Sequence, residues 1–181
     1  NNPYLSSGIQ YGLSGGSATT VYPESDFSNS SIISGGSLIE VPYQPSVTIT
    51  DLKQKDGSIG KVSIDRVSLS CKVYEGATDS SMSKGAGHYT SSGIYTGNIG
   101  LFGHNRGSHA YFAKLKNVKI GDIVEYKTAI GTKTYQVTFV GSISCTDYSY
   151  LNEMGDNRIT LITCIANQPS LRLCVQAVEI R

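Results

Sequence analysis

Three side chains in the second half of this 181-residue chain have the types and spacing for acyl transfer. Cys164 ends the apolar run "RITLITC", and Arg172 lies at the start of the next one, "LRLCVQAVEI". A neighbouring guanidinium favours the thiolate, which is the nucleophilic form of cysteine. Arginine also donates to an oxyanion but stays protonated, so another group must move protons. His104, which ends "NIGLFGH", supplies an imidazole suited to that task near pH 7.

Short runs of alternating apolar and polar residues must position these side chains. "KTYQVTFVGSI" places Tyr135, Val137 and Phe139 on one strand face, and with the preceding "DIVEYKT" it predicts a hairpin that turns near Gly131. "GKVSIDRVSLSCKVYEG", "NIGLFG", "RITLITC" and "LRLCVQAVEI" predict further strands, whereas "HAYFAKL" and "DSSMSKG" are long enough only for single helical turns. Seven or eight short strands with almost no helix predict an all-β barrel or sandwich.

The pairing of the last two predicted strands decides whether the chemistry is possible. If they pair about a turn containing Pro169, Cys164 and Arg172 meet at one rim of the sheet. The four cysteines lack the CxxC spacing of zinc sites and are too few for a disulfide scaffold. A net charge of +1 gives no sign of a nucleic-acid partner, and no run of about 20 apolar residues predicts a membrane span.

Charge and composition divide the chain near residue 55. Residues 1–52 contain no Lys, Arg or His and carry a net charge of −4, while the rest has 15 basic and 10 acidic residues, or +5. Runs such as "YGLSGGSATT" are typical of flexible spacers, so we interpret residues 1–55 as a linker or stalk and 56–181 as the folded domain. "LIEVPYQPSVTI" has the composition to dock on the body as an edge strand, although its two prolines would interrupt a ladder.

Over residues 56–181 these motifs resemble the sortases, cysteine transpeptidases of Gram-positive surfaces. "ITLITC" is similar to the family's TLxTC signature, so the resemblance implies that Cys164 is the nucleophile, Arg172 the essential arginine and His104, in "LFGHN", the histidine. "MSKGAGHYTSSGIYTGNIG", "GKVSIDRVSLSCKVYEG" and "YFAKLKNVKIGDIVEYKT" also resemble family segments. The implied fold is a closed sortase-type β-barrel of seven or eight strands with short helical turns. The details "KGAGHY" and "GHNRG" look most like class D, with class A as the second choice.

The resemblance also implies a substrate and a reaction. A surface protein with an LPxTG-like C-terminal sorting signal is cleaved between Thr and Gly through a thioester on Cys164. Arg172 and the backbone N–H of Ile165 hold the oxyanion, and His104 protonates the departing glycine amine. The acceptor is an amine of a peptidoglycan precursor. No cofactor is implied, and no metal is expected because no acidic cluster matches the class A calcium site.

Other side chains have weaker assignments. By resemblance the substrate groove is walled by Thr163, Tyr148 and Leu151, although ordinary packing explains the last two equally well. His88 and His109 are interpreted as structural or solvated. The remaining cysteines are interpreted as inert buried thiols: Cys71, Cys145 and Cys174.

Two alternatives to cell-wall anchoring are a pilin-polymerising sortase with a lysine acceptor and a non-catalytic β-barrel binding module. A papain-like protease would instead place its nucleophile at the start of a helix, with the histidine downstream. The resemblance places the enzyme at the extracellular face of the Gram-positive membrane, held by an N-terminal anchor absent from this sequence. Residues 1–52 could also fold back over the groove.

Overall fold

The computed structural model describes residues 31–34, 37–40 and 46–180, and the chain divides into two units at residue 45. In the first unit, β1 (Ser31–Ser34) pairs antiparallel with β2 (Ser37–Glu40) in a two-stranded sheet of its own. Residues 41–45 of the segment predicted to dock lie outside the described residues. The role of this unit as a linker or stalk stays a prediction.

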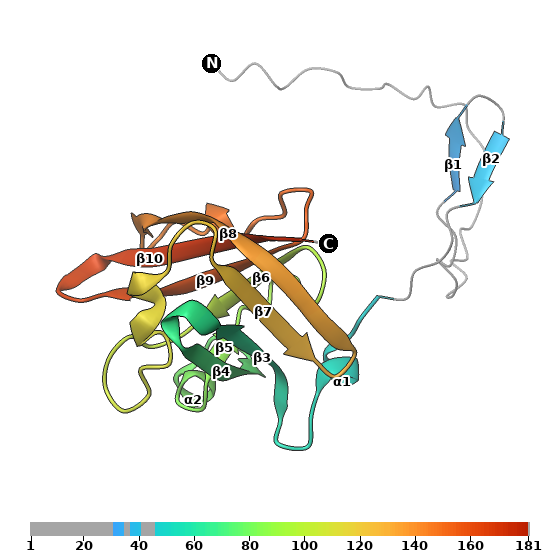
Figure 1. The fold of residues 1–181 in the computed structure, drawn as a ribbon. Helices are drawn as coiled ribbons and strands as arrows, with labels where there is room; N and C mark the ends of the chain where they lie inside the picture. Colours follow the sequence, from blue (N-terminus) through green and yellow to red (C-terminus); the bar gives the residue numbers. More distant parts are fainter. Residues whose placement is uncertain (1–30, 35–36, 41–45, 181) are drawn as a thin grey trace, which may run out of the picture. The chain divides into compact units, whose positions relative to one another are not determined.

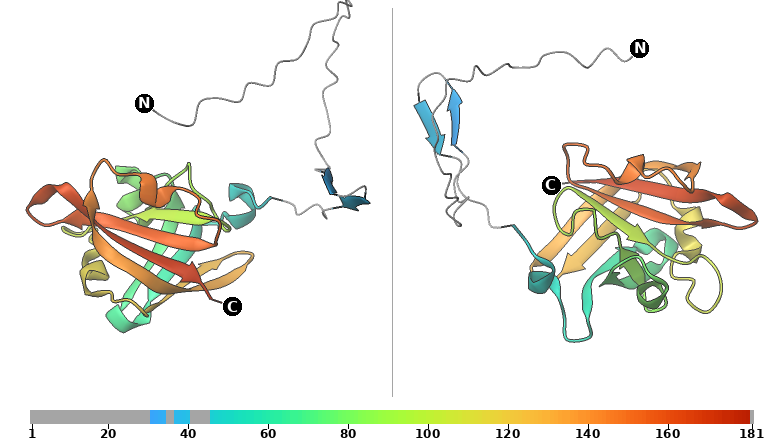
Figure 2. Two further views of the ribbon diagram at one scale, coloured as in Figure 1. Left: turned by 90° about the horizontal axis from the view of Figure 1, so that it is seen from above. Right: turned by 180° about the vertical axis from the view of Figure 1, so that it is seen from behind.

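The second unit is a closed β-barrel of eight strands in the order β10-β8-β7-β3-β4-β5-β6-β9 (Figure 1). This confirms the predicted all-β barrel. Most neighbours are antiparallel, but β4–β5 and β6–β9 are parallel, and the long strands β8 and β10 lie side by side in every view (Figure 2). The strands are β3 (Ser58–Ile64), β4 (Leu69–Glu75), β5 (Ala86–His88), β6 (Asn98–Phe102), β7 (Ile123–Thr128), β8 (Gly131–Ser144), β9 (Arg158–Ile165) and β10 (Gln168–Glu179).

In the described part of the chain, helical structure is limited to single turns. None of these turns has the length and apolar character needed to span a membrane. The turns are α1 (Ile49–Leu52), α2 (Asp79–Met82) and the 3-10 turns η1 (Asp65–Val67), η2 (Ala113–Asn117) and η3 (Ser149–Leu151). α1 belongs to the barrel unit, because Leu52 is fully buried in the core and Val47 and Ile49 pack against it. The domain boundary expected at residue 55 therefore lies inside this unit.

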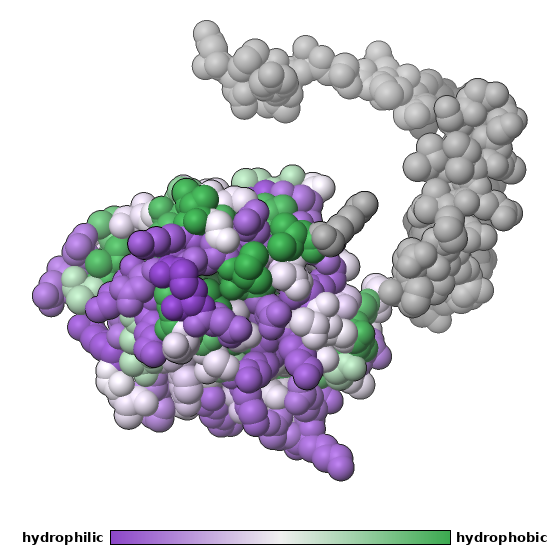
Figure 3. All heavy atoms as spheres, viewed as in Figure 1, coloured by the Kyte–Doolittle hydropathy of each residue, from purple (hydrophilic) through white to green (hydrophobic). Residues whose placement is uncertain are grey.

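The barrel strands β6, β9 and β10 bury side chains on both faces. Alternate residues of β9, such as Ile159 and Leu161, join the large apolar cluster inside the barrel. Ile162 lies in a second cluster, which packs beneath the β8–β9 loop (residues 145–157) with Leu151 and Cys174. Polar residues cover most of the lower part of the face drawn in Figure 3, and apolar residues gather near β8 and β10 above them.

A β-bulge in β8 changes which face its aromatic residue occupies. The β7–β8 hairpin forms as predicted, with Thr128 opposite Gly131, and Tyr135 and Val137 are buried in the barrel core. The register against β10 then skips Thr138. This extra residue reverses the alternation. Phe139 consequently packs in the second cluster and stacks on Tyr150 at 5.3 Å, so its predicted place beside Tyr135 and Val137 was wrong.

Two tyrosine hydroxyls in the barrel core are exceptions to its apolar character. Tyr126 and Tyr135 are fully buried, and among the described residues their hydroxyl groups have no hydrogen-bond partner. Burial raises the pKa of both phenols well above the ordinary value, because the charged form would be desolvated. These hydroxyls therefore remain neutral.

Candidate active site

Cys164 and Arg172 lie directly opposite each other on β9 and β10. The expectation that these strands pair is therefore confirmed, although Pro169 belongs to β10 and not to the turn. The turn consists of residues 166 and 167, and Asn167 has a left-handed φ of 61°. A register shift between Gln168 and Arg172 follows it. This tight connection places the thiol and the guanidinium on neighbouring strands at one rim.

His104 reaches the same rim because β6 is the parallel neighbour of β9. Their ladder ends where the Gly103 N–H donates to the Ile162 carbonyl at 3.2 Å. Two side chains continue the connection beyond that point. The Thr163 hydroxyl donates to the Gly103 carbonyl at 2.6 Å, and the Asn105 amide donates to the Cys164 carbonyl. The backbones that carry His104 and Cys164 are thus held together on both sides of the two residues.

A cavity of about 250 Å³ opens at this rim and is lined by all three candidate residues, His104, Cys164 and Arg172. The Cys164 residue is exposed and the other two are partly exposed. Four elements add apolar side chains to the remaining wall: Met82, Phe102, Ile143 and Ile162. The cavity therefore combines a reachable thiol, an imidazole and a guanidinium with an apolar surface.

The guanidinium of Arg172 is oriented by its own hairpin. Its Nη1 donates to the carbonyls of Pro169 at 2.9 Å and Leu171 at 2.8 Å. Within the described part of the chain, Nε and Nη2 have no acceptor. A guanidinium has five N–H groups in a fixed plane, so those on Nε and Nη2 are available to an oxyanion.

The four residues predicted to contact the substrate, three as groove wall and Ile165 through its backbone N–H, occupy different positions. Tyr148 is 55% exposed, lines the cavity and stacks on Tyr89 at 6.2 Å. Thr163 also lines the cavity, but it is buried and its hydroxyl is used on Gly103. Leu151 is buried over Gly100, outside the cavity lining, in agreement with the packing alternative. Ile165 pairs with Gln168 and does not line the cavity.

The other two histidines lie outside the cavity lining. His88 is fully buried, with Nδ1 2.8 Å from Glu75 Oε2 and Nε2 2.9 Å from the Gly93 carbonyl. His109 is exposed and stacks on Tyr111 at 6.5 Å. Their surroundings agree with the structural and solvated interpretations.

The remaining cysteines do not behave alike. Burial raises the pKa of both the Cys71 and the Cys174 thiol to about 12, which keeps them protonated. Cys145 is instead partly exposed and lines the cavity, so its prediction as a buried thiol was wrong. In the described residues no group of three or more His, Cys, Asp or Glu is arranged to hold a metal ion.

Sequence reasoning missed two contributors to the site. Asn105 follows His104 directly, and its position in "GHN" was the available signal, but its contact with the Cys164 carbonyl depends on the fold. Asp147 lines the cavity beside Tyr148, and its Oδ1 accepts from the backbone N–H of Ser149 at 3.0 Å and from its hydroxyl at 2.6 Å. These hydrogen bonds lower the pKa of the Asp147 carboxyl. The site therefore presents a carboxylate on its loop side.

Comparison with known proteins gives the same family at the level of sequence and of fold. The family model for the sortase domain matches residues 62–180. Sortase A of Listeria monocytogenes is 28% identical over 170 residues, which are 90% of this chain and 76% of that protein. Sortase A of Bacillus anthracis is 29% identical over 132 residues, which are 72% of this chain and 62% of that protein.

The fold is similar to those of two solved structures, a lid mutant of Streptococcus agalactiae sortase C1 and a group B Streptococcus pilus island 1 sortase C2. Each has a TM-score of 0.67 and 26% identity to this chain. The first match covers 72% of both chains, and the second covers 71% of this chain and 77% of the other. Since the names include sortase A and sortase C, assignment to class D stays a prediction. The family match includes Cys164, His104 and Arg172 and spans well over half of the sequence, and the chain therefore belongs to the sortase family of cysteine transpeptidases.

Proposed function

We propose that this sortase cleaves an LPxTG-like sorting signal between Thr and Gly and transfers the surface protein to an amine of a peptidoglycan precursor. The observation that supports it most is that Cys164, His104 and Arg172 line one cavity. The family assignment favours a transpeptidase over a non-catalytic binding module on the same barrel.

In the first half-reaction, Cys164 Sγ attacks the carbonyl carbon of the signal's threonine. The resulting oxyanion accepts hydrogen bonds from Nε and Nη2 of Arg172 and from the backbone N–H of Ile165, which directly follows Cys164 although it is not part of the cavity lining. His104 donates a proton to the glycine nitrogen as the C–N bond breaks, and the thioester remains on Cys164. Arg172 Nη1 keeps its hydrogen bonds to the Pro169 and Leu171 carbonyls throughout, and these bonds fix the plane of the guanidinium.

In the second half-reaction, an amine attacks the thioester carbonyl. His104 takes a proton from the attacking amine, the new amide forms, and the Cys164 thiolate leaves. Water in place of the amine would give hydrolysis. The extended signal lies against Tyr148, Thr163 and the apolar wall of the cavity.

Sortases are enzymes of the Gram-positive cell surface. We place this chain at the extracellular face of the membrane, with an N-terminal anchor and with the residues before the barrel unit, up to residue 45, as the linker between anchor and barrel. Its partners in this proposal are LPxTG-type surface proteins and the peptidoglycan precursor.

Mass spectrometry tests the proposed chemistry directly. The chain is incubated with an LPxTG-type peptide and a glycine-based amine, with Cys164→Ala as the control. We expect a thioester adduct on Cys164 and a new amide product, both absent from the control. Failure to form either with several motif variants, while Cys164 still reacts with a small alkylating reagent, would contradict the proposal.

Pilin polymerisation is the second candidate function. It is favoured by the similarity to solved sortase C structures, one of which is assigned to a pilus island. The two candidates differ only in the acceptor. Competition between a lysine side chain in a pilin-like peptide and a wall-type amine separates them, and preferential lysine transfer would select polymerisation.

A further inference from the structure

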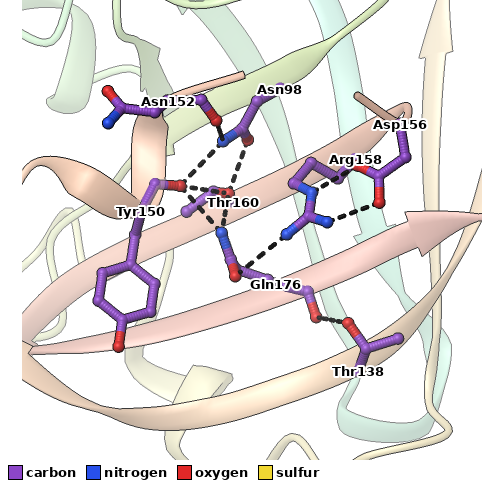
Figure 4. A network of polar contacts seen from close by, with 8 residues as sticks. All are labelled: Asn98, Thr138, Tyr150, Asn152, Asp156, Arg158, Thr160 and Gln176. Carbon is purple, nitrogen blue, oxygen red and sulfur yellow. Dashed lines mark hydrogen bonds and ion pairs between the residues drawn. The ribbon is translucent and has the colours of Figure 1, made fainter. Parts of the chain in front are cut away.

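A cluster of buried polar side chains lies beneath the β8–β9 loop and is separate from the catalytic residues. Asn98 on β6, Thr160 on β9 and Gln176 on β10 occupy neighbouring strands and are 0%, 0% and 5% exposed. Figure 4 shows their side chains converging on the backbone carbonyl of Tyr150, whose ring points away from them. Buried polar groups are costly unless they are hydrogen-bonded, so these amides require a specific partner.

The loop supplies that partner through its backbone. The Tyr150 carbonyl accepts from Asn98 Nδ2 and from Gln176 Nε2, each at 2.9 Å. Asn98 Nδ2 also donates to the Asn152 carbonyl at 2.9 Å. The two amides therefore bind the loop regardless of its side chains at these positions.

The other polar groups of the cluster have hydrogen-bond partners as well. The Thr160 hydroxyl donates to Asn98 Oδ1 at 2.7 Å and accepts from Gln176 Nε2 at 3.2 Å. Gln176 Oε1 accepts from Arg158, whose guanidinium is held by Asp156 at 2.6 Å. A network whose polar groups are all partnered holds one geometry, because each displacement breaks several bonds.

The short helix η3 connects the Tyr150 carbonyl, which the cluster binds, to Tyr148 in the cavity wall. Tyr148 directly precedes η3, and its carbonyl accepts from the Leu151 N–H at 3.0 Å, so Tyr148 and Tyr150 belong to one turn. The Tyr150 ring stacks on Phe139, and Leu151 packs over Gly100. Tyr148 itself lines the cavity beside Asp147. Fixing the Tyr150 carbonyl thus fixes the aromatic wall of the groove.

We propose that Asn98 and Gln176 are positioning residues for binding of the sorting signal, because they hold the β8–β9 loop in its binding geometry before the peptide arrives. The inference rests on the proposed function. It adds that two residues outside the cavity affect how tightly the sorting signal binds. A loop that is already ordered needs no ordering when the extended peptide binds. The catalytic residues are separate: Cys164 lies four residues beyond Thr160 on β9, about 13 Å away at the usual rise of a strand.

Two substitutions and a matched control test the inference. Gln176→Met removes the amide at nearly constant volume, and Asn98→Ala removes the second donor from another strand. Gln136→Met makes the same change at an exposed position of β8. We expect KM for the LPxTG-type peptide to rise about tenfold in either cluster variant, with kcat within about twofold of wild type. The control keeps both constants.

Two further measurements exclude a general structural effect. Hydrogen exchange of residues 145–153 should accelerate in the cluster variants while the barrel strands keep their protection. Alkylation of Cys164 by iodoacetamide, which needs no groove wall, should proceed at the wild-type rate. Equal losses in kcat, alkylation rate and barrel protection would overturn the inference in favour of a merely structural role.

Failure of the inference and failure of the proposed function give different results. A wild-type chain that turns over no sorting-signal peptide would overturn the proposed function and the inference with it. A wild-type chain that turns over the peptide, with an unchanged KM in both folded cluster variants, would overturn the inference alone. If Asn98→Ala does not fold, Gln176→Met still decides.

Discussion

The two faces of β6, β9 and β10 are both buried, but by different kinds of residue. On the inner face of β9, Ile159 and Leu161 meet other apolar side chains of the barrel core. The outer face of the same strand carries Thr160, Ile162 and Cys164, which in order belong to the polar cluster beneath the loop, pack in the second apolar cluster and line the cavity. β10 repeats the order with its own polar, buried and cavity-lining residues: Gln176, Cys174 and Arg172.

This difference shows how a small barrel separates stability from function. The inner face needs only apolar side chains of suitable size, because it is enclosed by the sheet itself. The outer face is covered by one loop, so its polar groups must match that loop's carbonyls, and its open end leaves Cys164 accessible. The comparison predicts large kinetic effects from outer-face changes and large stability effects from inner-face changes.

The largest expected effect is at the open end of the outer face. In Arg172→Lys the planar donors are replaced by a single ammonium, so we expect kcat/KM for the LPxTG-type peptide to fall about 10²–10³-fold. The free energy of unfolding should stay within about 1 kcal/mol of wild type, measured by urea denaturation. A variant that kept most of its activity would show that Arg172 is not the oxyanion donor.

An inner-face change should give the reverse result. Leu161→Ala removes a fully buried side chain from the barrel core, so the free energy of unfolding should fall by about 2–5 kcal/mol. kcat/KM per folded molecule should change only a few-fold. The adjacent outer-face variant Ile162→Ala is the matched comparison, and it should raise KM as well because Ile162 lines the cavity. Equal kinetic effects from the two variants would break the distinction between the faces.

The ion pair of Asp122, which lies away from both faces, should have a smaller and pH-dependent effect on the free energy of unfolding. Asp122 binds Nε and Nη2 of Arg66 and accepts from the Lys119 N–H at 2.7 Å, and these contacts lower the pKa of its carboxyl. Its stabilising contribution is present above the ordinary carboxyl pKa of about 3.9 and is lost as the pH falls through the folded-state pKa. Asp122→Asn should thus cost about 1 kcal/mol at pH 7, because Arg66 remains partly in water.

Urea denaturation of both chains between pH 7 and pH 2 measures this difference. The two curves should converge at the acid end, where the wild-type carboxyl is also protonated. A difference that stayed constant with pH would show that Asp122 contributes through packing and not through charge.

The smallest expected effect concerns the two tyrosine hydroxyls of the barrel core, which have no hydrogen-bond partner among the described residues. Tyr126→Phe removes a buried, unpaired hydroxyl and leaves the ring in place, so the free energy of unfolding should rise by up to about 1 kcal/mol. Thermal or urea denaturation measures it, with Tyr74→Phe as a control on a partly exposed ring. A clear loss of stability would show that the hydroxyl is bonded to an internal water.

The sequence was sufficient for features that depend on local alternation or on a motif. The all-β class, the β7–β8 hairpin and the opposition of Cys164 and Arg172 were predicted from short runs, and the family resemblance selected the closed barrel over a sandwich. Phe139 was assigned to the wrong face because one inserted residue reverses the alternation, and no local signal marked that bulge. Asn98 was overlooked because a polar residue at the start of a strand looks ordinary until its loop partners are known.

The parallel pairing of β6 with β9 has a consequence for the order of folding. His104 and Cys164 are brought together only when these two strands meet, and the chain between them forms the β7–β8 hairpin and the first part of β9. Pairings between segments so distant in sequence require closure of a long loop and are formed slowly. The antiparallel hairpins of the barrel can therefore form while the Cys164 thiol is still apart from the His104 imidazole. The site would therefore be assembled as one of the last events of folding, after the local hairpins of the barrel have formed.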